Sequence, residues 1–113
     1  MRRTESLDVR RGLEKLATYP HHVLTWVDET GYPVSVAVLA SLDPEADQAT
    51  VAAPAGLAVP TDRDVSLTGS HIRPQPGYGY DERRHVTVLG RATGGPAGRL
   101  RLRALRAWGW DEA

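Results

Sequence analysis

The stretch that most constrains the fold is 23–40, in which two apolar runs flank a short segment rich in Asp, Gly and Pro. The flanking runs carry the β-branched and aromatic side chains that suit a pleated, half-buried surface. The intervening residues 28–33 supply the bend between them. In the second run, apolar side chains alternate with small or polar ones, in the order Val34, Ser35, Val36, Ala37 and Val38. The stretch therefore predicts a β-hairpin with one apolar face and one face that is free to lie against something other than core.

Ahead of this hairpin the sequence predicts a short amphipathic helix. Over 6–18, apolar residues recur at roughly helical spacing with charged residues between them. Ser6 is placed to cap the start of this helix. We expect the helix to end before Tyr19 and Pro20, because proline disfavours helical geometry in the residue before it.

After the hairpin, short runs with strand-like alternation are separated by breaks rich in Gly and Pro. We expect strands over 48–53, 64–72 and 84–92, an acidic turn at 41–47, and breaks at 54–60, 73–81 and 93–98. The ending is ambiguous, because 99–103 alternates like a strand whereas Leu102, Leu105 and Trp108 are spaced as on a helix. We favour a sixth strand, followed by a frayed segment over 108–112.

This order of elements predicts a mostly β (α+β) chain, built as a small antiparallel barrel with a helix packed on it. At 113 residues we expect a single domain over 1–113. A chain of this length buries only a modest core, and a partner subunit would help to complete it.

Composition limits the function classes. The 14 basic residues balance the 14 acidic ones, so we expect neither nucleic acid nor a membrane as a partner. Arginines gather near both ends of the chain, where we interpret them as solvated faces.

The absence of cysteine excludes disulfides, thiolate zinc sites and cysteine nucleophiles. The N-terminus is charged and no apolar run reaches membrane-spanning length, so we expect a cytoplasmic protein.

The densest polar group lies on and just after the predicted strand 64–72. It comprises Ser66, Thr68, Ser70, His71 and Arg73. A phosphate needs several hydroxyl or amide donors and preferably a guanidinium, which donates two parallel hydrogen bonds. Ser70 and Arg73 provide such donors at a strand end, with Ser35 facing them from the hairpin. The alternative is an ordinary solvent-facing strand side, which antiparallel sheets normally show.

Other polar and aromatic residues suggest weaker sites. The loop 76–80 places Tyr78 between two glycines, where its ring either stacks on a flat cofactor or covers the barrel end in a surface turn. His21 and His22 would point to opposite sides of a strand, so they cannot chelate one ion together. Trp26 is a candidate for the core, and Trp108 and Trp110 are candidates for a subunit interface.

Several reaction classes receive no support. The P-loop, the Gly-x-Gly-x-x-Gly fingerprint and the Gly-x-Ser-x-Gly elbow are all absent. No Ser-His-Asp group can be assigned from spacing, so we expect neither a hydrolase nor a kinase. We predict no metal site and assign no catalytic residue.

Three stretches resemble the split-barrel family that includes pyridoxamine-phosphate oxidase and its flavin-binding relatives. They are 16–33, with its strand followed by Asp-x-x-Gly-x-Pro, the strand 65–71 after a loop containing Pro and Gly, and 86–92, a late strand ending in Gly and a basic or small residue. Together they cover most of 16–93. The resemblance implies a split β-barrel and a homodimer.

The resemblance also implies a cofactor, which would be FMN, with a deazaflavin or haem as alternatives. The expected cofactor-binding residues are Ser35, Ser70, His71, Arg73 and Tyr78, and by analogy His71 or His85 would ligate a haem. The implied function is a flavin-binding oxidoreductase, and the alternative is a non-catalytic module that binds haem, another ligand or only its partner subunit. One departure concerns the strand after the Gly-x-Pro turn, where relatives place basic or hydroxyl residues for a phosphate and this chain has only Ser35.

Overall fold

The structure is a computed structural model, and it describes residues 5–52, 59, 61, 63–75, 79–94 and 99–111. Within these ranges the side chains of 5, 70–75, 79–85 and 110–111 are outside the description. In chain order the described elements are β1 (Glu5–Leu7), α1 (Val9–Leu16), β2 (His22–Val27), β3 (Pro33–Val38), β4 (Ala40–Asp43), the 3-10 helix η1 (Pro44–Ala46), β5 (Gln48–Ala52), β6 (Asp64–Gln75), β7 (Gly79–Gly94) and β8 (Arg99–Asp111).

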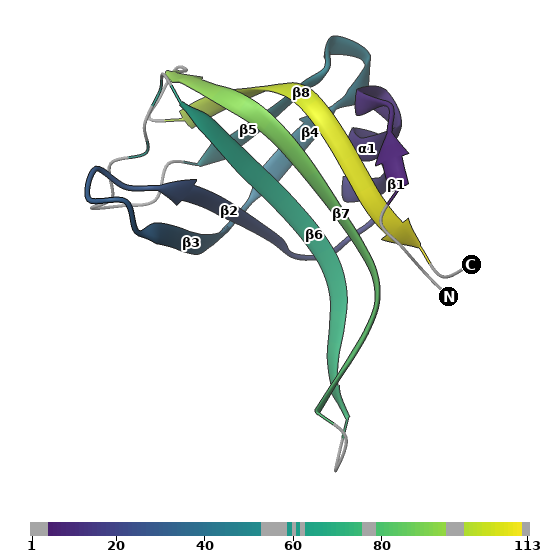
Figure 1. Cartoon of the computed structure of the whole chain (residues 1–113). Helices are drawn as coiled ribbons and strands as arrows, with labels where there is room; N and C mark the ends of the chain where they lie inside the picture. Colours follow the sequence, from purple (N-terminus) through teal and green to yellow (C-terminus); the bar gives the residue numbers. More distant parts are fainter. Residues whose placement is uncertain are drawn as a thin grey trace.

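All the strands belong to one antiparallel sheet in the order β3-β2-β6-β7-β8-β5-β4, and β1 adds to β8. Only Leu39 separates β3 from β4, so the two edge strands of the sheet meet and the sheet must curl round on itself. Figure 1 shows this half-barrel, with α1 beside β1 and β8 and with the β6–β7 hairpin projecting away from the curl. The prediction of a mostly β chain with a small antiparallel barrel and an N-terminal helix is confirmed.

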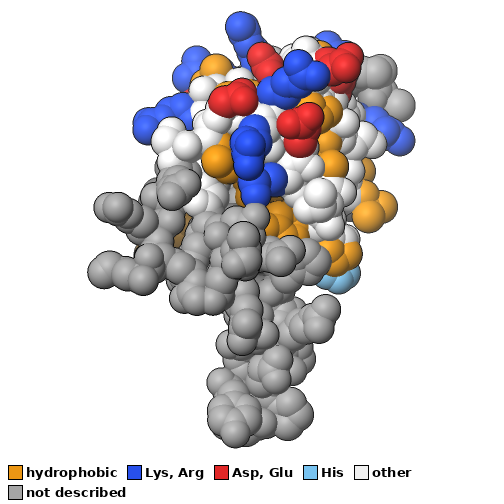
Figure 2. Space-filling model, turned by 90° about the vertical axis from the view of Figure 1, so that its right-hand side faces the viewer, with side chains coloured by type: hydrophobic (Ala, Val, Ile, Leu, Met, Phe, Trp, Pro, Cys, Tyr) orange, Lys and Arg blue, Asp and Glu red, His pale blue; other side chains and the backbone are white. Residues whose placement is uncertain are grey.

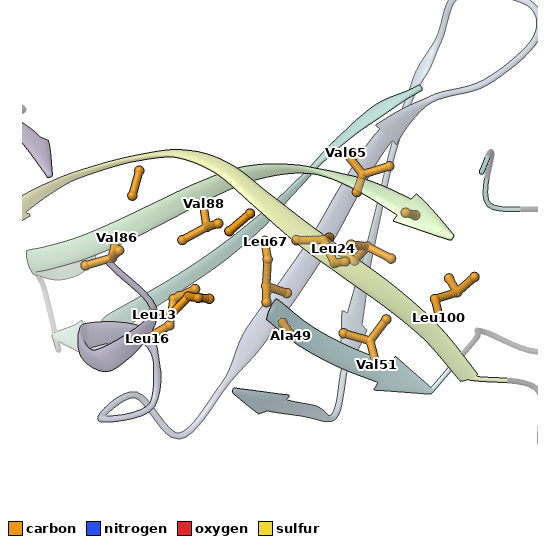
Figure 3. Close-up of a cluster of buried hydrophobic side chains, with 14 of the residues drawn as sticks. Leu13, Leu16, Leu24, Ala49, Val51, Val65, Leu67, Val86, Val88 and Leu100 are labelled. Atoms are coloured by element: carbon orange, nitrogen blue, oxygen red, sulfur yellow. The ribbon is translucent and has the colours of Figure 1, made fainter. Parts of the chain in front are cut away.

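The core fills the inside of the curl. Alternate residues of β2, β6, β7 and β8 point inward, as a pleated sheet with one buried face requires. Figure 3 shows that the helix contributes Leu13 and Leu16 to the same cluster. The largest fully buried side chains are Leu13, Leu16, Leu24, Leu67, Leu102, Val51, Val65, Val86 and Val88. Trp26 is 3% exposed, which confirms its prediction as core.

Helix α1 begins later than its sequence pattern suggests. Asp8 is the N-cap, and its carboxylate accepts a hydrogen bond of 3.0 Å from the backbone N–H of Arg10. The prediction that Ser6 caps the helix is wrong, because Ser6 lies in β1 opposite Trp108. Among the described residues, no helix is long and apolar enough to cross a membrane.

The strands extend further than predicted. Residues 41–43, expected in an acidic turn, belong to β4. Residues 73–75 and 79–81, expected in a loop, continue the paired ladder of β6 and β7. Strand β7 also runs through Thr93 and Gly94, where a break was expected. The ambiguous C-terminal segment is a strand, β8, and pairing continues to Asp111, so the frayed end over 108–112 is wrong for 108–111. The segment is a strand because it pairs with β7, β5 and β1, and the periodicity of the sequence alone does not show these pairings.

Candidate functional site

The candidate site is built on the outer face of the sheet, the side that points away from the core. The pairing of β2 with β3 sets Thr25 opposite Ser35, and the pairing of β2 with β6 sets Thr25 opposite Ser66. These three residues, here called the hydroxyl row, therefore cross three neighbouring strands in a line. The hydroxyl oxygens of Thr25 and Ser35 lie 2.9 Å apart and share a hydrogen bond.

A second polar row runs beside the first. Its members on the central strands are Thr68 and Thr87, which face each other across β6 and β7 with their hydroxyl oxygens 3.1 Å apart. On β2, Val23 stands opposite Thr68 of β6 and is 37% exposed. Val27, further along the same face of β2, is 50% exposed. The outer face thus combines hydroxyl pairs with exposed apolar side chains.

This combination fits the ring system of a flavin. Each hydroxyl can donate one hydrogen bond and accept two, so a pair that shares one bond still has one donor and several lone pairs to offer. The ring's polar edge needs neutral donors and acceptors of this kind, and its apolar body suits the neighbouring valines. The described residues of this face are therefore compatible with a flavin ring.

The hairpin turn that holds β2 and β3 in this register is stabilised by hydrogen bonds within the turn itself. One carboxylate oxygen of Asp28 accepts hydrogen bonds from the Thr30 hydroxyl at 2.7 Å, the Thr30 N–H at 2.9 Å and the Tyr32 N–H at 3.0 Å. These donors, the Thr30 hydroxyl first, lower the pKa of Asp28 below its ordinary value of 3.8. Gly31 has a φ of 91°, a backbone conformation that favours glycine.

Two of the predicted site residues, Ser35 and Ser70, stand at different positions along the sheet. Ser35 is exposed on β3 and lies in line with Ser66. Ser70 lies four residues further along β6, about 13 Å at the usual rise of a strand. The register therefore does not set Ser35 opposite Ser70, because Ser70 pairs with His85 instead.

Other predicted residues are placed only by their backbone. His71 and Arg73 lie on β6, next to a register shift between Ser70 and Ile72, and their side chains lie outside the described residues. The same holds for the side chains of His85 and Trp110, and Tyr78 falls wholly outside the described residues. Trp108 is half-buried on β8. No cluster of three metal-ligating side chains occurs in the described part of the chain.

Two features of this face were missed in the sequence. Thr25 was taken as part of an apolar run, although its alternation with Leu24 and Trp26 signals the outward face. The second feature is the common face of β7 and β8 on which exposed arginines gather, since the C-terminal arginines were interpreted only as a solvated face. The group comprises Arg91, Arg99, Arg101, Arg103 and Arg106. Among them Arg91 bonds to the carboxylate of Asp64 at 3.2 Å.

In the described part of the chain, the curled antiparallel half-barrel with helix α1 has the split-barrel fold. No protein-family model matches the sequence, and no curated protein matches it either. Solved structures do match its fold. The FAD-binding protein from Mycobacterium smegmatis aligns over 96% of this chain and 97% of that chain, with a TM-score of 0.68 and 9% identity.

Two further solved structures share the fold. A candidate 5-nitroimidazole antibiotic resistance protein from Bacteroides thetaiotaomicron matches over 97% of this chain and 88% of that chain, with a TM-score of 0.69 and 11% identity. A candidate pyridoxamine 5'-phosphate oxidase from Corynebacterium glutamicum matches over 95% of this chain and 91% of that chain, with a TM-score of 0.53 and 14% identity. At these identities the likeness establishes the fold, and the resemblance seen in the sequence agrees with it.

Proposed function

We propose that the protein binds FMN or a related flavin on the outer face of β3, β2 and β6 and takes part in an oxidation–reduction reaction. The observation that carries the proposal is the hydroxyl row, Ser35, Thr25 and Ser66, on a fold shared with an FAD-binding protein over nearly the whole of both chains. A bound flavin would supply the electron transfer itself. The chain would bind the ring, orient it and limit its access to water.

We also propose that the protein is a homodimer through this outer face. Val23, Val27 and Leu105 are 37%, 50% and 46% exposed there, which is apolar surface that a second copy would cover. A covered flavin would be shielded from solvent on both sides of its ring. Sedimentation equilibrium measures the mass directly, and a monomer at all protein concentrations would refute the homodimer.

Titration of the purified protein into FMN and into FAD tests the flavin proposal, with quenching of flavin fluorescence as the readout. We expect saturable binding of at least one of the two. Thr25→Val and Ser66→Ala should each weaken binding about fivefold, because each removes one hydrogen bond worth roughly 1 kcal/mol. Ser41→Ala is a matched control, because Ser41 is an exposed serine on β4 outside the hydroxyl row.

Two outcomes would contradict the proposal. One is the absence of saturable binding of either flavin. The other is a Soret band on addition of haem together with no flavin binding, which would favour the alternative of a haem-binding module.

A further inference from the structure

A β-bulge on β8 decides which way its arginines point. Leu89 pairs with Arg106 but the next residue, Gly90, pairs with Ala104, so Leu105 is an extra residue on β8. In an uninterrupted strand, residues three apart point to opposite faces. The extra residue shifts this alternation, and Arg103 and Arg106 both lie exposed on the outer face while Ala104 and Ala107 are buried.

Gly90 allows this bulge to form. A Cβ atom at position 90 would overlap the backbone oxygen of Arg103 and would lie 2.7 Å from a methyl carbon of Leu102. Only glycine lets the two strands approach so closely at this point. Gly90 on β7 is therefore the residue that lets the bulge form on β8.

The arginines brought together here carry unbalanced charge. Arg103 stands opposite Arg91 across β7 and β8, and Arg91 is the one that pairs with Asp64. Neither Arg103 nor Arg106 forms an ion pair with another described residue. On the side of the molecule that carries α1, by contrast, acidic and basic side chains are mixed, as Figure 2 shows. Like charges gathered on one surface repel, and an anion bound between them would relieve that repulsion.

Arg106 is also aligned with the proposed flavin surface. Leu89 stands opposite both Ser66 on β6 and Arg106 on β8, so Arg106 continues the hydroxyl row. Two strand spacings, about 10 Å, separate the backbones of Ser66 and Arg106. A ligand with a neutral ring at one end and a phosphate at the other can therefore reach both.

We propose that Arg103 and Arg106 bind the phosphate of a flavin nucleotide whose ring lies on the hydroxyl row. This inference rests on the proposed flavin binding and adds the group that distinguishes a flavin nucleotide from riboflavin. The guanidinium groups donate paired hydrogen bonds to phosphate oxygens. Strand β3, which offers only Ser35 to an anion, does not need to supply the phosphate ligand.

The test compares the dissociation constants of riboflavin and FMN, which differ by the phosphate, using fluorescence quenching. We expect the wild-type protein to bind FMN at least about tenfold more tightly than riboflavin. Arg103→Ala and Arg106→Ala should each reduce this preference severalfold and leave riboflavin affinity unchanged. Arg11→Ala, which removes an exposed positive charge on α1, should keep the full preference. Circular dichroism melting checks that each variant is folded.

The outcomes separate the two proposals. Equal affinity of the wild type for riboflavin and FMN would overturn the phosphate site and leave flavin binding intact. A preference for FMN that survives in both arginine variants would overturn the assignment to these residues. If neither flavin binds, the proposed function fails and the phosphate site fails with it.

Discussion

The ring Nε2 of His22 lies 2.7 Å from the backbone oxygen of Leu16 and joins the start of β2 to the end of α1. A carbonyl oxygen only accepts hydrogen bonds, so the Nε2–H of His22 is the donor. The Leu16 oxygen belongs to the last turn of the helix, where carbonyls have no partner within the helix. His22 is 8% exposed, so this hydrogen bond is buried between the helix and the sheet.

The Leu16 oxygen also accepts a hydrogen bond of 3.1 Å from the backbone N–H of Tyr19. Replacement of His22 by alanine should therefore destabilise the fold by about 2 kcal/mol, because it removes a buried ring and one of the two hydrogen bonds that the Leu16 oxygen accepts. Its neighbour supplies a matched control. His21 is exposed, and His21→Ala should change stability by less than about 0.5 kcal/mol. Urea unfolding measures both. Equal effects of the two substitutions would show that the His22 hydrogen bond contributes nothing to stability.

Two glycines of β7, Gly90 and Gly94, should respond differently to alanine. Gly90→Ala places a methyl group against the backbone of Arg103 and should cost about 1–3 kcal/mol or more, because a backbone atom cannot move aside as a side chain can. Gly94→Ala meets nothing within 4 Å and should be nearly neutral. Thermal unfolding of both variants is the measurement. A Gly90→Ala protein as stable as the wild type would mean that the strands do not approach as described.

The free energy of unfolding that the hairpin turn contributes should decrease in acid. The pKa of Asp28 is lower in the folded chain than in the unfolded one, so its ionised form stabilises the fold above the unfolded value of 3.8. This contribution disappears as the pH falls through the lower folded value. Asp28→Asn, which lacks the charge, should be less stable than the wild type at neutral pH, and the difference should vanish in strong acid.

Urea unfolding midpoints from about pH 7 to about pH 2 test this dependence. Glu29→Gln is the control at neutral pH. Glu29 is an exposed carboxylate beside Asp28, and its side chain forms no hydrogen bond with another described residue. A difference between the wild type and Asp28→Asn that stays constant across the range would refute the role of the charged carboxylate.

Local patterns predict the central hairpin well because its second strand alternates cleanly and its turn contains Asp, Gly and Pro. The order 34–38 gave the outward position of Ser35, and the structure agrees. Strand β4 was missed because Asp43 and Pro44 are typical of a turn. The segment is a strand because it pairs with β5. The loop expected at 73–81 failed for a similar reason, since long-range pairing of β6 with β7 overrides the local composition.

The candidate site was harder to predict than the fold. The union of Thr25, Ser35 and Ser66 in one row depends on the register between three strands, two of which are far apart in the sequence. The outward direction of Arg106 depends on the bulge, and simple alternation from Arg103 would have turned Arg106 toward the core. The flavin proposal came from resemblance, and the structure supplies a surface that fits it.

The most direct test of the account maps where a flavin touches the protein. Two-dimensional amide NMR spectra of the labelled protein, recorded during titration with FMN, locate the contacts residue by residue. If the flavin binds as proposed, the shifts gather at Thr25, Ser35, Ser66 and Arg106, with little change at Arg11 on α1. Shifts confined to residues away from the outer face of β3, β2, β6 and β8, or no shifts at all, would contradict it.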